Sequence, residues 1–319
     1  MAPIRSWALF LVSLTVPVFP QAWLPAKGEG YVSIGFQTMF IGHHLSSFGK
    51  STGTSENIRS NAASMGLTYG VTDRFAVAVS IPFIATRYLG STPHGDFDGP
   101  TRLDDGSYHG TFQDFRIDTH YNLIRRSVMV TPFFTLAIPS HHYDTFGHAA
   151  QGRDLREYQA GFDLGYQLRP FLPRAYTNLR YGYAFVQNIA DISTDRSNVD
   201  LELGYFLKPS VVVRGFGNWQ RTHGGLENSP NFNLPPHQYH LHDRVWRAHY
   251  LRLGGGVIFS LRPNLDLYTA VMATPSGKNA ERNTAIGVGI SWRFTRRPEN
   301  ELPAALQNQT GDPGGAPQP

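Results

Sequence analysis

Large apolar side chains alternate with small or polar ones along residues 284–294, the last strongly patterned segment of the chain. Successive side chains of a β-strand point to opposite faces, so the segment has one large face and one small face. The large face consists of Ile286, Val288, Ile290, Trp292 and Phe294, and the small face of Ala285, Gly287, Gly289, Ser291 and Arg293. One apolar face that suits lipid, opposite a face of small side chains that suits a hydrated lumen and ends in an arginine, is typical of the closing strand of an outer-membrane β-barrel.

About twelve segments show the same period of two, each close to the roughly 9 to 11 residues that a tilted membrane strand needs. We place them at residues 30–41, 58–69, 74–86, 112–123, 128–138, 158–166, 175–187, 199–205, 210–220, 249–261, 264–273 and 283–294. Short connectors rich in Gly, Pro, Asn and Asp alternate with longer polar ones at residues 42–57, 88–111, 139–156, 188–197, 221–248 and 274–282. This pattern predicts an all-β fold: a single antiparallel transmembrane β-barrel of about 12 strands over residues 28–294, with short periplasmic turns and longer extracellular loops.

The second face of the predicted strand 112–123 is the strongest argument for a barrel lumen. Phe115, Ile117, Thr119, Tyr121 and Leu123 share one face, whereas the other carries Asp114, Arg116, Asp118, His120 and Asn122. A soluble core would not accept so many polar and charged side chains without partners, because burying an unpaired charge is costly.

Extending the alternation to the other strands gives the full set of charged and titratable residues on the lumen face. They are Asp114, Arg116, Asp118, His120, Asp163, Arg180, Asp200, Glu202, Arg214, Arg252, Asp266 and Arg293. One interpretation is a cross-strand lattice of salt bridges that braces a narrow barrel. The other is a constriction that orients a polar or anionic solute, with Arg116, Arg180, Arg214 and Arg252 as the attracting cations. The mixed signs argue against strong ion selectivity and against a wide general porin.

Composition sets the compartment and removes several function classes. Residues 1–22 combine one early positive charge with an apolar run, which predicts a signal peptide. Residues 295–319 are rich in Pro, Gly, Gln and Asn, so we expect a disordered periplasmic tail. The chain has no cysteine, which excludes disulfides and thiolate sites, and a net charge of only +4, which gives no reason to expect a nucleic-acid partner.

Twelve of the thirteen histidines fall in or beside the predicted extracellular loops. His237, His240 and His242 are weak candidates for capturing a metal ion, although their spacing matches no strong ligand signature. The alternative is that these are polar loop residues that respond to pH. Tyr239, Trp246 and Tyr250 nearby would form either an aromatic rim for solutes or a membrane-interface girdle.

Catalysis is not expected. Ser140, His142 and Asp144 supply the residue types of a hydrolase within one loop, but such composition arises by chance. The chain contains no nucleophile elbow, no HExxH sequence and no paired catalytic carboxylates. We therefore predict that the protein is not an enzyme and needs no cofactor.

Several short motifs occur in a fixed order along the chain. They are Lys-Gly-Glu-Gly at 27–30, Tyr-Gly-Val-Thr-Asp-Arg at 69–74, Ile-Pro-Phe at 81–83, Gly-Lys-Asn at 277–279 and Gly-Ile-Ser-Trp-Arg-Phe at 289–294. Together they resemble a family of outer-membrane proteins assigned to a phenol-degradation meta-cleavage pathway. The resemblance implies an outer-membrane barrel that transports small, often hydrophobic or aromatic compounds, and it implies no particular binding residues. The chain departs from the pattern by continuing past Phe294.

These observations predict a channel in the bacterial outer membrane for passive uptake of a small molecule, and the resemblance implies that this molecule is hydrophobic or aromatic. The competing hypotheses are a structural or adhesion barrel whose lumen is closed by salt bridges, metal capture by the loops and, less favoured, an outer-membrane hydrolase. The expected partners are outer-membrane lipid, the solute, and the barrel-assembly machinery, which would read the strand that ends at Phe294.

Overall fold

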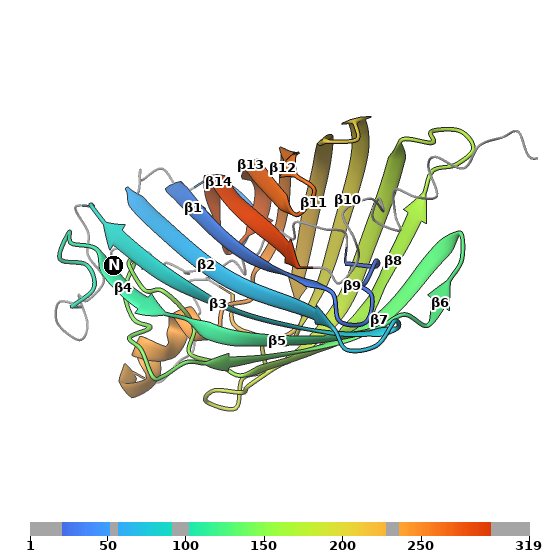
Figure 1. Cartoon of the computed structure of the whole chain (residues 1–319). Coiled ribbons are helices and arrows are strands. Elements are labelled where there is room, and N and C mark those ends of the chain that lie inside the picture. Colours follow the sequence, from blue (N-terminus) through green and yellow to red (C-terminus); the bar gives the residue numbers. More distant parts are fainter. Residues whose placement is uncertain (1–20, 52–56, 91–101, 228–235, 295–319) are drawn as a thin grey trace, which may run out of the picture.

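The chain forms a closed antiparallel β-barrel in a computed structural model that describes residues 21–51, 57–90, 102–227 and 236–294 (Figure 1). The predicted tail 295–319 and all but the last two residues of the predicted signal peptide 1–22 lie outside the described residues. The elements are β1 (Gly30–Leu45), β2 (Ile58–Gly70), β3 (Phe75–Tyr88), β4 (His109–Phe112), β5 (Asp114–Tyr121), β6 (Ile124–Arg125), β7 (Val128–Pro139), β8 (Glu157–Gln167), β9 (Ala175–Val186), β10 (Arg196–Lys208), β11 (Val211–Thr222), the 3₁₀ helix η1 (Pro236–Arg244), β12 (His249–Arg262), β13 (Leu265–Lys278) and β14 (Ala280–Phe294).

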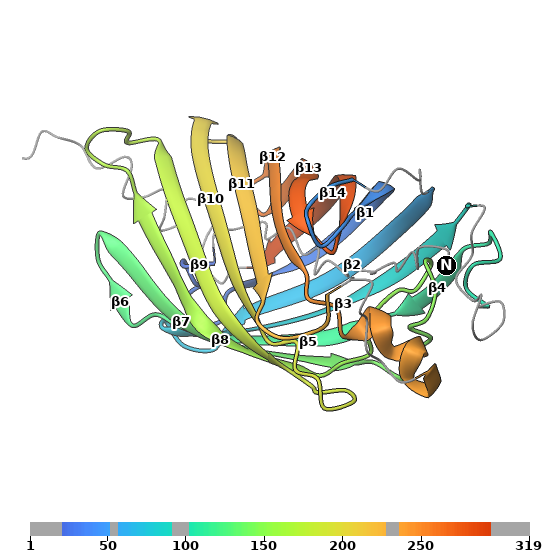
Figure 2. The ribbon, with the colours of Figure 1, turned by 180° about the vertical axis from the view of Figure 1, so that it is seen from behind.

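Twelve strands cross the barrel, as the alternation predicted. β4 and β5 are two parts of one strand along β3, interrupted at Gln113, whose backbone N–H still donates to the Pro82 carbonyl at 2.9 Å. β6 is a two-residue extension of the turn that leads into β7. Each remaining strand pairs with its sequence neighbour, and β1 pairs with both β2 and β14, which closes the ring (Figure 2).

The barrel turns its apolar side chains outward. Ile34 and Phe36 of β1 are 52% and 50% exposed, whereas Gln37 and Met39, which follow them on the opposite face, are buried. Exposed Phe115 and Ile117 alternate in the same way with lumen-facing Arg116 and Asp118 on β5. An apolar exterior around a polar interior, with all strands paired, suits a bilayer, and places the protein in a bacterial outer membrane.

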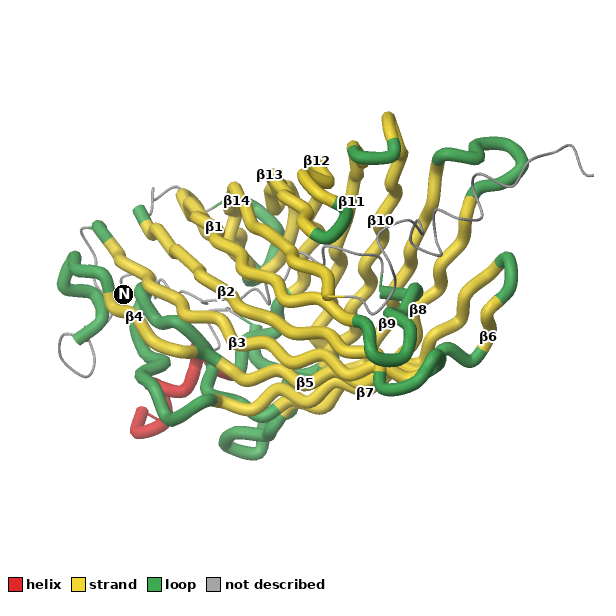
Figure 3. Tube along the Cα trace, viewed as in Figure 1, coloured by secondary structure: helices red, strands yellow, loops and turns green. Residues whose placement is uncertain are grey.

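Short turns join the strands at one end of the barrel and longer connectors at the other, where η1 also lies (Figure 3). By the usual arrangement of such barrels the turn end faces the periplasm. No helix in the described part of the chain is long and apolar enough to span a bilayer.

The last connector is shorter than the sequence predicted. Instead of a loop over residues 274–282, β13 runs to Lys278 and β14 begins at Ala280, with Asn279 alone between them. Lys278 pairs with His249 and Glu281 pairs with His44, so the neighbouring strands extend both ladders beyond the expected boundary. Asn279 has a φ of 46°, and asparagine tolerates this left-handed conformation better than most residues.

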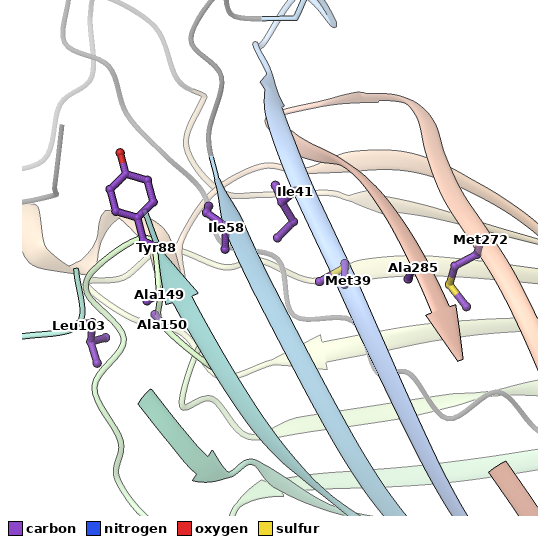
Figure 4. Packing of buried hydrophobic residues seen from close by; sticks show 9 residues of the cluster. All are labelled: Met39, Ile41, Ile58, Tyr88, Leu103, Ala149, Ala150, Met272 and Ala285. Atoms are coloured by element: carbon purple, nitrogen blue, oxygen red, sulfur yellow. The ribbon is translucent and has the colours of Figure 1, made fainter. Parts of the chain in front are cut away.

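An apolar cluster packs at the loop end of the barrel (Figure 4). Met39 and Met272 point into it from the wall, and Leu103, Ala149 and Ala150 reach it from two connectors that were expected to be polar extracellular loops. Parts of these loops therefore fold inward and pack. Figure 4 shows the full cluster, which is Met39, Ile41, Ile58, Tyr88, Leu103, Ala149, Ala150, Met272 and Ala285.

Candidate functional site

Charged side chains form a row that follows the register around the lumen. Asp163 of β8 lies opposite Arg180 of β9, Arg180 opposite Asp200 of β10, Asp200 opposite Asn218 of β11, and Asn218 opposite Arg252 of β12. Arg180 Nη1 is 3.3 Å from Asp163 Oδ2, and Asn218 Nδ2 donates to Asp200 Oδ1 at 2.6 Å. The row arises because inward positions on neighbouring antiparallel strands meet as direct cross-strand pairs.

Arg180 is the centre of this network. Its Nη2 is 3.6 Å from Asp118 Oδ1, and its guanidinium lies 3.4 Å from the centroid of the Phe133 ring. Asp118 also accepts from Arg116 Nε at 3.3 Å, and His120 Nδ1 is 3.7 Å from Asp163 Oδ2. Asp118 and His120 of β5 are thus gathered against β9 and β8, each beside a side chain of opposite type.

Two further ion pairs lie on the lumen face of other strands. Arg214 Nη1 is 3.2 Å from Glu202 Oε2, and Tyr176 donates its hydroxyl to Glu202 Oε1 at 2.7 Å. Arg293 Nη2 is 3.3 Å from Asp266 Oδ2, close to the end of the closing strand. Arg214 is fully buried and fixed by its partner, so it is not available to a solute in this arrangement.

Arg252 differs from the other predicted cations because neutral groups hold it. Its Nε donates to Thr274 Oγ1 at 3.4 Å, and its guanidinium lies 4.8 Å from the centroid of the Tyr250 ring. Within the described ranges it forms no ion pair with a carboxylate. Its positive charge is therefore the least compensated of the four arginines that the sequence singled out.

A cavity of about 80 Å³ lies within the lumen between two unlike walls. One wall, from β1–β3, β13 and β14, carries small or uncharged residues such as Gly35, Ser64 and Tyr268. The other carries charged residues, which are Asp114, Arg116, Arg153, Glu157 and Arg196. The arrangement offers a molecule an uncharged surface on one side and hydrogen-bonding, charged groups on the other.

Arg153, Glu157 and Arg196 were not among the predicted lumen residues. Arg196 and Glu157 form a close ion pair, and Arg153 Nη2 is 3.7 Å from Glu157 Oε2. Burial and the neighbouring Arg196 lower the pKa of Arg153 to about 10, against the opposing effect of Glu157. Continuing the alternation by one residue before strand 158–166 and by three residues before strand 199–205 would have placed Glu157 and Arg196 inside.

A loop tyrosine completes the charged wall. Tyr143 donates its hydroxyl to Asp114 Oδ1 at 2.7 Å and accepts from the Asp154 backbone N–H at 3.1 Å. Burial, with the adjacent carboxylate of Asp114 second, raises the pKa of Tyr143. Its loop position has no periodic signal, so strand alternation could not assign Tyr143 to the lumen.

The loop candidates for metal capture are not gathered into a ligand set. His240 is exposed and His242 is fully buried beside Asp243, with His242 Nε2 3.1 Å from Asp243 Oδ1. The side chain of His237 lies outside what the structure describes. The described part of the chain holds no group of three His, Cys, Asp or Glu residues placed to bind a metal ion.

The loop residues that resembled a hydrolase set have other partners. Ser140 Oγ is 2.8 Å from His141 Nδ1 and donates to the Phe112 carbonyl at 2.8 Å. His142 Nδ1 is 2.9 Å from Asp154 Oδ2. The structure therefore pairs Ser140 and His142 separately, rather than in a nucleophile–base contact.

Comparison with solved structures shows an outer-membrane barrel fold. The COG4313 outer membrane channel from Pseudomonas putida F1 is similar over 87% of this chain and 100% of that chain, with a TM-score of 0.67 and 11% identity. The NanC porin gives a TM-score of 0.48 at 8% identity over 82% of this chain and 100% of its own, and the Pseudomonas putida toluene transporter TodX gives 0.42 at 8% over 86% and 90%.

At such identities the likeness to the COG4313 channel shows the fold alone, and the other two scores are too low to carry an argument. No protein-family model matches the chain, and no curated protein sequence matches it. These comparisons do not assign the chain to the phenol-degradation family that its motifs resemble.

Proposed function

We propose that the protein is an outer-membrane channel for passive uptake of a small molecule. The observation that carries this proposal is the cavity of about 80 Å³ inside the closed barrel, bounded by one uncharged wall and one charged wall. The chain forms an all-β barrel similar in fold to the COG4313 outer membrane channel, and the fold itself leaves the solute open.

The mechanism would be diffusion through the lumen. A solute arriving from outside meets the apolar cluster around Met39 and Leu103, which must part to admit it. It then passes the cavity, where Arg116 and Arg196 contact its polar end while the small residues of β1 and β2 border its body. No step in this sequence needs a covalent change or a nucleotide.

The solute class follows from the two kinds of surface along this route. An apolar outer gate followed by a half-charged cavity suits a compact molecule with an apolar body and a polar group. This agrees with the hydrophobic or aromatic cargo that the motif resemblance implies. Arg252, held by Thr274 and Tyr250 without a carboxylate partner, would add positive potential in the lumen and so a preference for anions.

Conductance measurements test the proposal. The full-length protein, purified from outer membranes and inserted in planar bilayers, is expected to give discrete current steps. Proteoliposomes are expected to admit small aromatic alcohols and acids faster than sugars of equal mass. Absence of both current and solute flux would refute a channel.

The ion-pair lattice favours one competing function, a structural or adhesion barrel that transports nothing. In that case Arg180–Asp163 and Arg214–Glu202 would serve only to brace the wall. The same bilayer experiment separates the two functions, because a barrel that is sealed by a bracing lattice should carry no current. Metal capture and hydrolysis have no comparable support from the contacts of the loop residues.

A further inference from the structure

Two arginines lie side by side on the outer surface of the barrel, near its loop end. Arg59 of β2 and Arg87 of β3 are direct cross-strand partners, and Phe40 of β1 lies opposite Arg59 on the other side. Phe40 and Arg87 each follow an exposed, outward-facing residue of the same strand, Phe36 and Phe83, by four positions. Because this spacing is even and direct partners share a face, both arginines point away from the lumen.

Neutral groups hold both guanidinium groups against the wall. Arg59 Cζ lies 4.9 Å from the centroid of the Phe40 ring, and Arg59 Nε donates to Thr38 Oγ1 at 3.3 Å. Arg87 Cζ lies 4.8 Å from the centroid of the Tyr108 ring, in the connector just before β4. An aromatic face attracts a cation but leaves its charge in place.

The positive charge on this part of the surface is not balanced by the chain. Exposed Arg282 of β14 lies opposite His43 of β1, two residues from outward-facing Thr284, and adds a third cation on the next strands of the ring. We call Arg59, Arg87 and Arg282 the outer arginine cluster. Within the described ranges none of the three forms an ion pair with a carboxylate. Like charges directly opposite each other destabilise a sheet, so an anion from outside the chain would relieve the repulsion.

The height of the cluster on the wall indicates which anion is within reach. Phe36 and Phe83 belong to the apolar band that faces lipid, with exposed fractions of 50% and 39%. Four residues advance about 13 Å along a strand, so the guanidinium groups lie beyond that band toward the loop end. The loop end faces the outside of the cell. The cluster is therefore at the polar boundary of the outer leaflet, where lipopolysaccharide carries the phosphate groups of its lipid A anchor.

We propose that the outer arginine cluster is a binding site for the lipid A phosphates of lipopolysaccharide. Arg59 and Arg87 donate paired N–H groups to phosphate oxygens, a geometry for which guanidinium is well suited. The acyl chains of the same lipid lie along the apolar band that includes Phe36 and Phe83. The proposal rests on the position of the barrel in the outer membrane and is independent of whether the lumen conducts a solute.

Binding of lipid A to the full-length protein in detergent tests the site. Bisphosphorylated lipid A is titrated into purified protein that has been freed of lipopolysaccharide, and native mass spectrometry measures the bound fraction. We expect Arg59→Gln and Arg87→Gln each to weaken the affinity about tenfold. Arg262→Gln is the matched control, because it removes an exposed arginine at the turn end, and it should leave the affinity unchanged.

Two competitors distinguish lipopolysaccharide from other sources of phosphate. Inorganic phosphate and phosphatidylglycerol are each added at the concentration of lipid A, and we expect neither to displace it. Displacement by inorganic phosphate would indicate a site for the free ion. Equal affinity for phosphatidylglycerol would indicate a surface that takes any anionic lipid. Either result would overturn the proposal, as would an unchanged lipid A affinity in Arg59→Gln and Arg87→Gln.

Thermal unfolding in bilayers gives a second, independent readout. A ligand that binds only the folded protein raises its unfolding temperature. Adding lipid A to phosphatidylcholine bilayers should therefore raise the unfolding temperature of the parent protein and of Arg262→Gln, and should raise that of the double variant Arg59→Gln/Arg87→Gln much less. Heat-modifiable mobility on gels confirms that each variant forms a closed barrel. An equal rise in all three proteins would show that lipid A stabilises the barrel without using this cluster.

Discussion

Asp163 and Arg180 form a direct cross-strand ion pair in the lumen, with Asp163 Oδ2 3.3 Å from Arg180 Nη1 and the Asp163 side chain fully buried. The pair joins β8 to β9, and Arg180 extends it to Asp118 on β5. The consequence is that charge in this part of the lumen is balanced locally rather than by water.

Removing one member of this pair should destabilise the barrel strongly. Asp163→Leu leaves the Arg180 guanidinium without its nearest buried partner, and we expect a loss of about 3 to 5 kcal/mol in the free energy of unfolding. The double variant Asp163→Leu/Arg180→Met should recover most of that loss, because it removes both charges. Urea unfolding in detergent or lipid, followed by tryptophan fluorescence, measures both. Equal destabilisation by the single and double variants would contradict this view of the pair.

The seam between β1 and β14 has no room for a side chain at Gly30. A Cβ there would lie 2.2 Å from the Thr68 carbonyl oxygen and 2.6 Å from Phe294 Cζ. We expect Gly30→Val to prevent closure or to lower the unfolding temperature of the barrel severely, because a backbone atom blocks the new methyl groups. Gly42→Val on the same strand is the matched control, since no atom lies within 4 Å of its added Cβ. Heat-modifiable mobility on gels reports closure.

The aromatic end of β14 should be needed for assembly, whereas the residues after it should not. Phe294 stacks on Tyr69 at 6.4 Å between centroids and packs against Trp292 at 6.0 Å. Deleting 292–294 should abolish outer-membrane insertion, and deleting 295–319 should leave it intact. Fractionation of outer membranes, with heat-modifiability of the recovered protein, distinguishes the two. The reverse result would show that the assembly machinery reads the chain end and not this strand.

Arg252 should influence ion preference more than Arg214 does. Replacing Arg252 by Gln removes a cation that no carboxylate balances, so the anion-to-cation permeability ratio should fall severalfold. Arg214→Gln instead leaves Glu202 without its ion-pair partner and should act mainly on stability. Reversal potentials in a salt gradient measure the first effect and unfolding midpoints the second. An unchanged ratio in Arg252→Gln would remove this residue from the solute path.

Strand alternation predicted most of the wall because lipid and lumen impose opposite demands on neighbouring residues. β5 follows this rule, since each side chain lies on the face that its polarity requires. Phe115 and Ile117 face outward, and Arg116 and Asp118 face the lumen. The number of crossing strands followed from the same rule. Alternation did not predict the extension of β13 and β14 up to Asn279, because that extension depends on how far the neighbouring strands β12 and β1 continue.

The inward-folded segments were not predictable from local patterns. Leu103 and Ala149 lie in connectors of mixed composition, and their burial depends on packing against Met39 and Ile58 from distant strands. Trp23, which precedes β1, has no periodic context either; it lies against Gly165, over a hundred residues away in the chain, where an added Cβ would be 2.7 Å from Trp23 Cη2. Such contacts are set by tertiary structure, where neither hydropathy period nor turn chemistry is informative.

β1 pairs along its length with β14, so the barrel closes between the first and the last of its described strands in sequence order. Every other crossing strand meets its sequence neighbour, so hairpins of low contact order form early, while the ring itself waits for the complete chain. Until then the unpaired edges of β1 and β14 are both open to pairing with other chains. Before membrane insertion, chaperone protection is therefore most needed at these two edges. A slow final folding phase should correspond to the pairing of β1 with β14.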